Sequence, residues 1–256
     1  MQVLLARLER ATRPVVDGLC RELSASGYKP VFFELRIKGG AQGSPEPVII
    51  KSDERRIFVY GTIDRVDAFV DDGDVYVRVV DYKTGTKVFS PSDLAEGKNL
   101  QMFLYLRAIV DTENQGFKVA LGGSPDSKIL PGGVIYTHTA ISDATVTSPS
   151  PDVERAAIDE KQKRAGMVLD DERSISAMSR EHLPLTFDRS GNISSTDRLY
   201  TIDGWQKISE TVEESVKRVA DGITHGRAEA PKKDRRDSPC DYCDFKHVCR
   251  NATMKK

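Results

Sequence analysis

The stretch GTIDRVDAFVDDGDVYVRVVDYKTG, residues 61–85, decides how this chain folds. Residues 57–70 and 75–82 are extended segments rich in Val, Ile, Phe and Tyr, which is typical of β-strands. Between them, Asp71-Asp72-Gly73-Asp74 is a strong signal for a tight hairpin turn. The stretch therefore predicts two antiparallel strands joined by a short loop.

Three charged side chains of this hairpin are predicted to meet. Asp81 and Lys83 are two residues apart and so point to the same face of their strand, whereas Tyr82 points away. Asp64 lies on the preceding strand, and facing side chains of paired strands lie within about 5 Å of each other. We expect Asp64 and Asp81 to share one cation. Ligation by oxygen alone favours Mg²⁺ or Mn²⁺ over zinc.

A carboxylate beside an amine has two interpretations. With a bound cation, the lysine stabilises charge on an attacked phosphate or positions the attacking water. Taken alone, the Asp-x-Lys pattern is equally typical of surface salt bridges at the end of a hairpin. Gln101 and Tyr105, four residues apart on one face of a predicted helix, favour the functional interpretation, although alone they indicate only the polar edge of a core helix.

The remaining pattern predicts a mixed α/β (α+β) architecture. Apolar spacing predicts an N-terminal helix broken at Pro14 and capped by Gly27. A further stripe from Trp205 to Ile223 predicts a long amphipathic helix. Other expected elements are strands over 31–38 and 134–139, helices over 92–110 and 153–166, and a turn-rich segment over 116–133. This order predicts a mixed sheet flanked by helices, not a regular βαβ array.

Composition indicates an ordinary globular chain. The 256 residues are 39% hydrophobic and 30% charged, with a formal net charge of -1, which excludes a wholly basic surface. No apolar run is long enough for a transmembrane helix, and no signal peptide is recognisable. We expect a cytoplasmic protein. Residues 227–256 are basic, with nine Lys/Arg against five Asp/Glu, which suits phosphates.

Three cysteines of this tail have metal-ligand spacing. Cys240, Cys243 and Cys249 form a C-x2-C-x5-C pattern, and three thiolates so close together favour one metal centre. The candidates are an iron–sulfur cluster and zinc, for which His247 is an alternative ligand. Cys20 is the only other cysteine. It is an open candidate for the fourth ligand, but its helix face equally predicts an ordinary buried thiol.

Taken together, these motifs resemble a known family. Glu34 in a strand, GTIDRVD, VVDYKTG and the Gln101/Tyr105 pair are similar to the RecB-like branch of the PD-(D/E)XK nucleases. Within it, the chain looks most like the C-terminal nuclease domains of AddB-type helicase–nuclease subunits. YKPVFFEL at 28–35, GMVLDDE at 166–172 and CDYCDFKHVC at 240–249 add to this resemblance, which covers nearly the whole chain.

The resemblance implies a restriction-endonuclease-like core that hydrolyses DNA. Asp64 and Asp81 would be the Mg²⁺ (or Mn²⁺) ligands and Lys83 the catalytic lysine, and Glu34 would be an accessory acid. Gln101 and Tyr105 would contact the DNA strand or support the site. Asp67 is interpreted as a structural acid.

The resemblance also implies cofactors, partners and a process. The tail cysteines would bind a four-iron four-sulfur cluster that pins residues 227–256 to a nuclease core spanning residues 1–226. The partners would be DNA, the AddA motor protein and the rest of an AddB-type protein. The process would be resection of DNA ends during recombinational repair.

The sequence also departs from this family. The RecB-like branch usually carries a histidine before the acidic motifs, whereas the first histidine here is His138. No phosphate-binding GxxxxGK[ST] loop occurs. We therefore expect a C-terminal fragment with weak nuclease activity in isolation. A catalytically silent DNA-end-binding module and a stand-alone RecB-like exonuclease are the alternatives.

Overall fold

The computed structural model describes residues 2–38, 43–52, 55–84, 89–94, 96–139, 150, 163–227, 240 and 243–249. The chain divides into two compact units, Met1–Val216 and Lys217–Lys256. The first unit contains the complete β-structure and most of the helices. Among the described residues, every helix is too short or too polar to cross a membrane.

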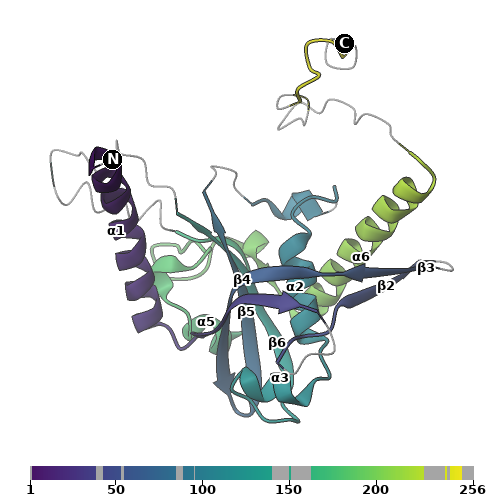
Figure 1. Cartoon of the computed structure of the whole chain (residues 1–256). Coiled ribbons are helices and arrows are strands. Elements are labelled where there is room, and N and C mark those ends of the chain that lie inside the picture. The colour runs from purple at the N-terminus through teal and green to yellow at the C-terminus, as the bar shows by residue number, and fades with distance from the viewer. Residues whose placement is uncertain are drawn as a thin grey trace. The chain divides into compact units, whose positions relative to one another are not determined.

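A six-stranded mixed sheet forms the centre of the first unit (Figure 1). Its strand order is β1-β4-β5-β6-β7-β8. The β5–β6 and β7–β8 pairs are parallel, and the other three pairs are antiparallel. The strands are β1 (Lys29–Ile37), β4 (Gly61–Asp71), β5 (Asp74–Lys83), β6 (Ile129–His138), β7 (Ala165–Leu169) and β8 (Leu199–Tyr200). The predicted mixed sheet flanked by helices is confirmed.

The β4–β5 hairpin forms as the sequence predicts. The two strands are antiparallel, with Asp71 opposite Asp74. The two turn residues, Asp72 and Gly73, have φ values of 50° and 83°. A two-residue hairpin turn of this kind needs positive φ at both positions, and Asp-Gly is one of the few pairs that tolerate it. This turn fixes the register on which the candidate site depends.

Helices cover both the core and the edges of this sheet. The bounds are α1 (Gln2–Ala25), η1 (Pro91–Leu94), α2 (Gln101–Val110), α3 (Gln115–Ala120), α5 (Glu172–Ser176), η3 (Arg180–His182), η4 (Thr196–Arg198) and α6 (Ile202–Thr224). Helix α2 packs on β5 and β6 with an almost wholly apolar surface. Trp205 of α6 stacks on Phe103 of α2 with ring centroids 6.4 Å apart. The core is therefore a sheet covered by α2, with α6 as a further layer.

Several predicted element boundaries are wrong. Helix α1 runs through Pro14 and ends at Ala25, and Gly27 instead donates its N–H to the carbonyl of Ala177. The helix predicted over 92–110 starts only at Gln101, because Asn99 adopts a positive φ of 55°. A residue in this left-handed conformation cannot continue a right-handed helix.

Other differences concern extended structure. A second, two-stranded sheet, β2 (Val48–Ser52) with β3 (Arg55–Val59), lies where the sequence indicated only a turn and the start of the next strand. The segment predicted as turn-rich over 116–133 contains most of α3. The helix predicted over 153–166 falls mostly outside the described residues, and its last two positions begin β7 instead.

Candidate active site

The β4–β5 hairpin brings Asp64 to the strand that carries Asp81. The register pairs Arg65 with Val80, so Asp64 is the next residue along β4 and lies opposite Asp81. The Asp64 carboxylate accepts a hydrogen bond of 3.0 Å from the backbone N–H of Tyr82. Asp64 is therefore held against the backbone between Asp81 and Lys83.

Asp81 and Lys83 form a close ion pair. The Lys83 Nζ lies 2.8 Å from the Asp81 Oδ2, with 44% of the lysine side chain and 13% of the aspartate side chain exposed. The ammonium also lies 5.9 Å from the centre of the Tyr136 ring, a distance at which a cation is attracted to the ring face. Burial raises the pKa of the Tyr136 hydroxyl well above its ordinary value, and the charge of Asp81 raises it further. Tyr136 is therefore a neutral wall beside the ion pair.

Glu34 lies in the neighbouring strand at the same level. Phe33 pairs with Arg65 and Leu35 with Ile63, so the register places Glu34 opposite Asp64. Glu34 is exposed and has a φ of 50°, which is uncommon for a residue other than glycine. Such strain clusters at functional sites. Glu34, Asp64 and Asp81 thus occupy adjacent positions across β1, β4 and β5.

Gln101 and Tyr105 form a supporting pair on α2. The Gln101 Nε2 donates a hydrogen bond of 2.8 Å to the Tyr105 hydroxyl, which confirms that both lie on one helix face. Tyr105 is only 7% exposed, whereas Gln101 is exposed. The Tyr105 ring occupies the space that a Cβ would fill at Gly61, the first residue of β4. Tyr105 therefore supports the strand that carries Asp64, and Gln101 is the member of the pair available to a substrate.

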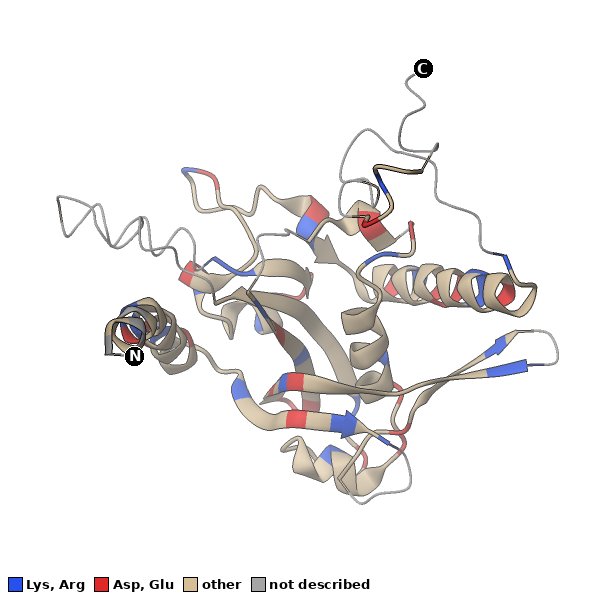
Figure 2. Ribbon diagram, turned by 45° about the horizontal axis from the view of Figure 1, so that its top comes forward, with Lys and Arg blue, Asp and Glu red and all other residues tan. Residues whose placement is uncertain are grey.

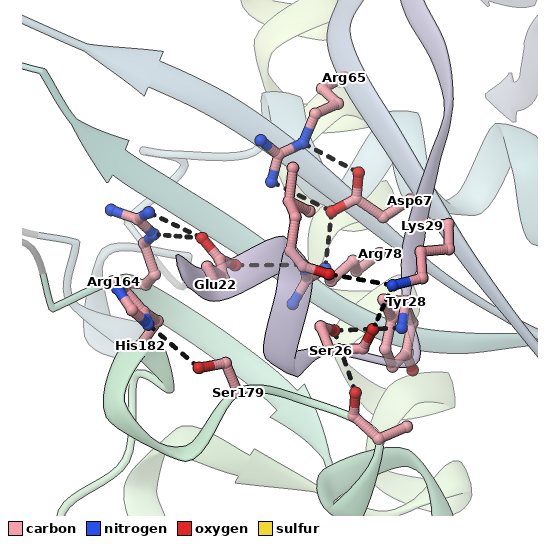
Figure 3. Close-up of polar contacts among 12 residues, drawn as sticks. Glu22, Ser26, Tyr28, Lys29, Arg65, Asp67, Arg78, Arg164, Ser179 and His182 are labelled. Atoms are coloured by element: carbon pink, nitrogen blue, oxygen red, sulfur yellow. Dashed lines mark hydrogen bonds and ion pairs between the residues drawn. The ribbon is translucent and has the colours of Figure 1, made fainter. Parts of the chain in front are cut away.

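A buried ionic network lies behind the hairpin (Figure 3). Asp67 accepts ion pairs from Arg65 Nε at 2.9 Å and Arg78 Nε at 2.8 Å. Glu22 of α1 continues the network, 3.1 Å from Arg78 and 2.7 Å from Arg164. All five side chains are at most 3% exposed. The interpretation of Asp67 as a structural acid agrees with this arrangement.

The network reaches the site through a residue that sequence reasoning did not single out. Arg65 Nη1 donates a hydrogen bond of 2.7 Å to the hydroxyl of Tyr82. Tyr82 stands between Asp81 and Lys83 in the chain, and its N–H binds Asp64. The alternation of side chains placed Arg65 and Tyr82 on the side away from the acids, which was the available signal for this contact.

The donor set of the hairpin fits a hard cation. Asp64 and Asp81 supply carboxylate oxygens, and Mg²⁺ is commonly held by one or two carboxylates with water completing its shell. Within the described part of the chain, three His, Cys, Asp or Glu side chains nowhere converge as a ready-made metal group. The protein ligands are thus limited to the two hairpin aspartates, with Glu34 beside them.

The tail cysteines are described in the second unit. Cys240, Cys243 and Cys249 are free thiols in one turn, in which the Cys243 N–H donates to the Cys240 carbonyl at 3.4 Å. Their chemistry fits a thiolate-bound metal, but they supply only three of the four ligands that such centres take. Cys20 is exposed on α1, so the interpretation of it as a buried thiol is wrong: its helix face is not covered by the core.

Comparison with known proteins gives a family and several relatives. The family model described as the PD-(D/E)XK nuclease superfamily matches residues 2–250. Over 97% of its length, the chain is 29% identical to an AddB-type component of the ATP-dependent helicase/deoxyribonuclease of Clostridium acetobutylicum, covering 21% of that protein. It is 27% identical to the protein of the same name from Alkaliphilus oremlandii, again over 97% of this chain and covering 22% of that protein. The chain thus spans about a fifth of the length of the curated relatives it matches.

Proposed function

We propose, from the premise that this chain belongs to the PD-(D/E)XK nuclease superfamily, that it hydrolyses DNA phosphodiester bonds with a divalent cation held by Asp64 and Asp81. One observation carries the proposal. An amine lies 2.8 Å from the carboxylate of Asp81, on the hairpin segment whose backbone fixes the carboxylate of Asp64. Two acids and a partly exposed cation together match the needs of phosphate chemistry.

Each residue has a role in this reaction. The bound Mg²⁺ or Mn²⁺ would supply Lewis acidity and lower the pKa of a water molecule. The Lys83 ammonium would stabilise the negative charge that develops on the attacked phosphate, and Asp81 holds that ammonium in place. Exposed Glu34 is placed to orient the attacking water. Gln101 would contact the DNA strand, while Tyr105 keeps β4 in position.

The biological setting follows from the relatives. They are named as components of ATP-dependent helicase/deoxyribonucleases, and this sequence carries no GxxxxGK[ST] loop of its own. We propose that a separate AddA-type motor supplies the ATP-driven unwinding. The chain would then act as an exonuclease in the cytoplasm, on DNA ends being resected for recombinational repair.

The cysteine turn is proposed to hold a four-iron four-sulfur cluster through Cys240, Cys243 and Cys249, with a fourth ligand from Cys20 or another segment. Protein purified without oxygen should be brown and contain iron and acid-labile sulfide, and the Cys243→Ala variant should be colourless. A colourless wild-type protein with stoichiometric zinc would instead assign the turn to zinc.

The nuclease proposal is tested with end-labelled DNA and Mg²⁺ or Mn²⁺. Asp81→Ala should abolish cleavage and keep DNA binding, because it removes a cation ligand and leaves the phosphate-binding surface. Lys83→Ala should lower the cleavage rate by about 10²- to 10³-fold, the usual loss when one charge-stabilising donor is removed. Asp203→Asn, an exposed change on α6, is the matched control and should cleave like wild type.

The same assay separates the main alternative. A silent DNA-end-binding module would bind DNA without cutting it, and Asp81→Ala would change neither property. Cleavage that survives both Asp81→Ala and chelation of divalent metal would reject the proposed site.

A further inference from the structure

The β2–β3 hairpin has one covered face and one open face. Val48 is 7% exposed and Ile50 is fully buried, so alternate residues of β2 pack inward. On the opposite face, Ile49 stands opposite Phe58 and Lys51 opposite Arg56, and these four side chains are exposed. The hairpin therefore presents a mixed apolar and basic surface to solvent.

Two aromatic rings dominate this open face. Phe58 is 45% exposed and Tyr60 is 61% exposed. Their ring centroids lie 6.4 Å apart with planes inclined by 19°. The guanidinium of Arg56 lies 5.9 Å from the centre of the Phe58 ring. Exposed large aromatics are costly on a free surface, and a cation beside two near-parallel rings is an arrangement suited to nucleic-acid bases and phosphates.

The open face leads along the chain toward the acids. From Arg56 to Thr62 the even-numbered residues are exposed, and the odd-numbered residues are half-buried or less. Tyr60 directly precedes Gly61, where the Tyr105 ring packs. Asp64 is six residues beyond Phe58, or about 20 Å along an extended chain. A bound strand would therefore have a short path from the rings to the site.

Charge selects the partner. The segment from Arg36 to Tyr60 carries five Lys/Arg and three Asp/Glu, although the whole chain has a net charge of -1. Basic residues mark both strands of the β2–β3 hairpin near its end (Figure 2). Paired bases are already stacked on one another inside a duplex, whereas unpaired bases leave faces free for protein rings. The surface thus matches single-stranded DNA better than duplex DNA.

We infer that the open face of the β2–β3 hairpin is a binding platform for single-stranded DNA, with bases stacked on Phe58 and Tyr60 and phosphates at Lys51, Arg55 and Arg56. The inference rests on the proposed function for its substrate class, since the strand held here is the one delivered to Asp64 and Asp81. It assigns a strand-holding role to residues outside the catalytic motifs.

The first test measures binding to an unlabelled oligothymidine in EDTA, on the Asp81→Ala background, so that cleavage plays no part. Phe58→Trp should bind like its parent, and the fluorescence of the added indole should be quenched by the DNA. Phe58→Leu and Tyr60→Leu keep apolar side chains but lose the ring face. Each should weaken binding about 5- to 100-fold, the range for one stacked base. Val70→Ala, an exposed change at the far end of β4, is the control and should have no effect.

The second test uses salt. Arg55→Gln and Arg56→Gln should each reduce the slope of log affinity against log salt by about 0.7, one phosphate contact on a single strand. Unchanged affinity in both leucine variants would overturn the inference, as would unquenched indole fluorescence or a loss confined to association with another protein. Because these measurements need no catalysis, the platform can fail while cleavage persists, or persist when cleavage is absent.

Discussion

The Arg65 guanidinium donates a hydrogen bond of 2.7 Å to the Tyr82 hydroxyl and lies 5.6 Å from the centre of its ring. Arg65 follows Asp64 in β4, and Tyr82 lies between Asp81 and Lys83 in β5. The contact therefore joins the two strands of the site from behind. Its other end is anchored by the buried carboxylate of Asp67, so a rigid ionic network supports the residues that would hold the cation.

Removing this contact should separate positioning from folding. Tyr82→Phe deletes one hydroxyl and should cost about 1 kcal/mol of unfolding free energy, with a fall in the cleavage rate larger than any change in DNA affinity. Arg65→Met leaves Asp67 short of one partner and should cost about 3 kcal/mol or more. Denaturant unfolding and single-turnover cleavage measure both effects. A Tyr82→Phe protein with wild-type cleavage would show that the contact is only structural.

The buried network should make the fold sensitive to acid. Burial alone would raise the pKa of Glu22, but the guanidinium groups of Arg78 and Arg164 outweigh it and lower the pKa below 4.5. A lowered folded-state pKa stabilises the fold at pH values above 4.5, and this stabilisation is lost as the pH falls below that value. Glu22→Gln should therefore be less stable than wild type at pH 7 and show a flatter decline from pH 5 to 3.

His182 adds a second, milder window. Burial and the nearby charge of Arg164 lower its pKa from 6.5, and its Nδ1 lies 3.1 Å from the Ser179 hydroxyl. The neutral ring stabilises the fold above pH 6.5, and that contribution is lost as the pH falls below this value. Urea unfolding of His182→Gln should lose the slope between pH 6.5 and 5. An unchanged slope there would refute the assignment.

Gly61 should not tolerate a larger side chain. A Cβ at this position would overlap the Tyr105 ring and hydroxyl, so Gly61→Ala should cost about 1–3 kcal/mol by overpacking. The Gly61→Ala/Tyr105→Leu double variant should lose less stability than the sum of the two single variants, because the smaller side chain frees the space. Additive losses in thermal unfolding would mean that the two positions do not interact.

The sequence predicted the hairpin and its acids because local rules determine them. An Asp-Gly turn fixes the register, and alternation then decides which side chains share a face. Asp64 and Asp81 could be placed opposite each other on these grounds alone. The start of α2 could not, because the left-handed conformation of Asn99 depends on its surroundings.

Long-range contacts explain the rest of what the sequence missed. Glu22 and Arg164 are 142 residues apart, yet they form one ion pair, and no local pattern indicates such a partner. The apolar residues of α1 predicted a covered helix, whereas Leu5, Leu8 and Val16 are more than half exposed. Helical spacing shows that a stripe exists but not what covers it.

Manganese binding followed by electron paramagnetic resonance tests the central claim most directly. The account predicts that the wild-type chain takes up Mn²⁺ at one site, that Asp64→Asn and Asp81→Asn each weaken this uptake at least tenfold, and that Asp203→Asn leaves it unchanged. Equal Mn²⁺ uptake by all four proteins would contradict the account, because the hairpin acids would then not form the cation site.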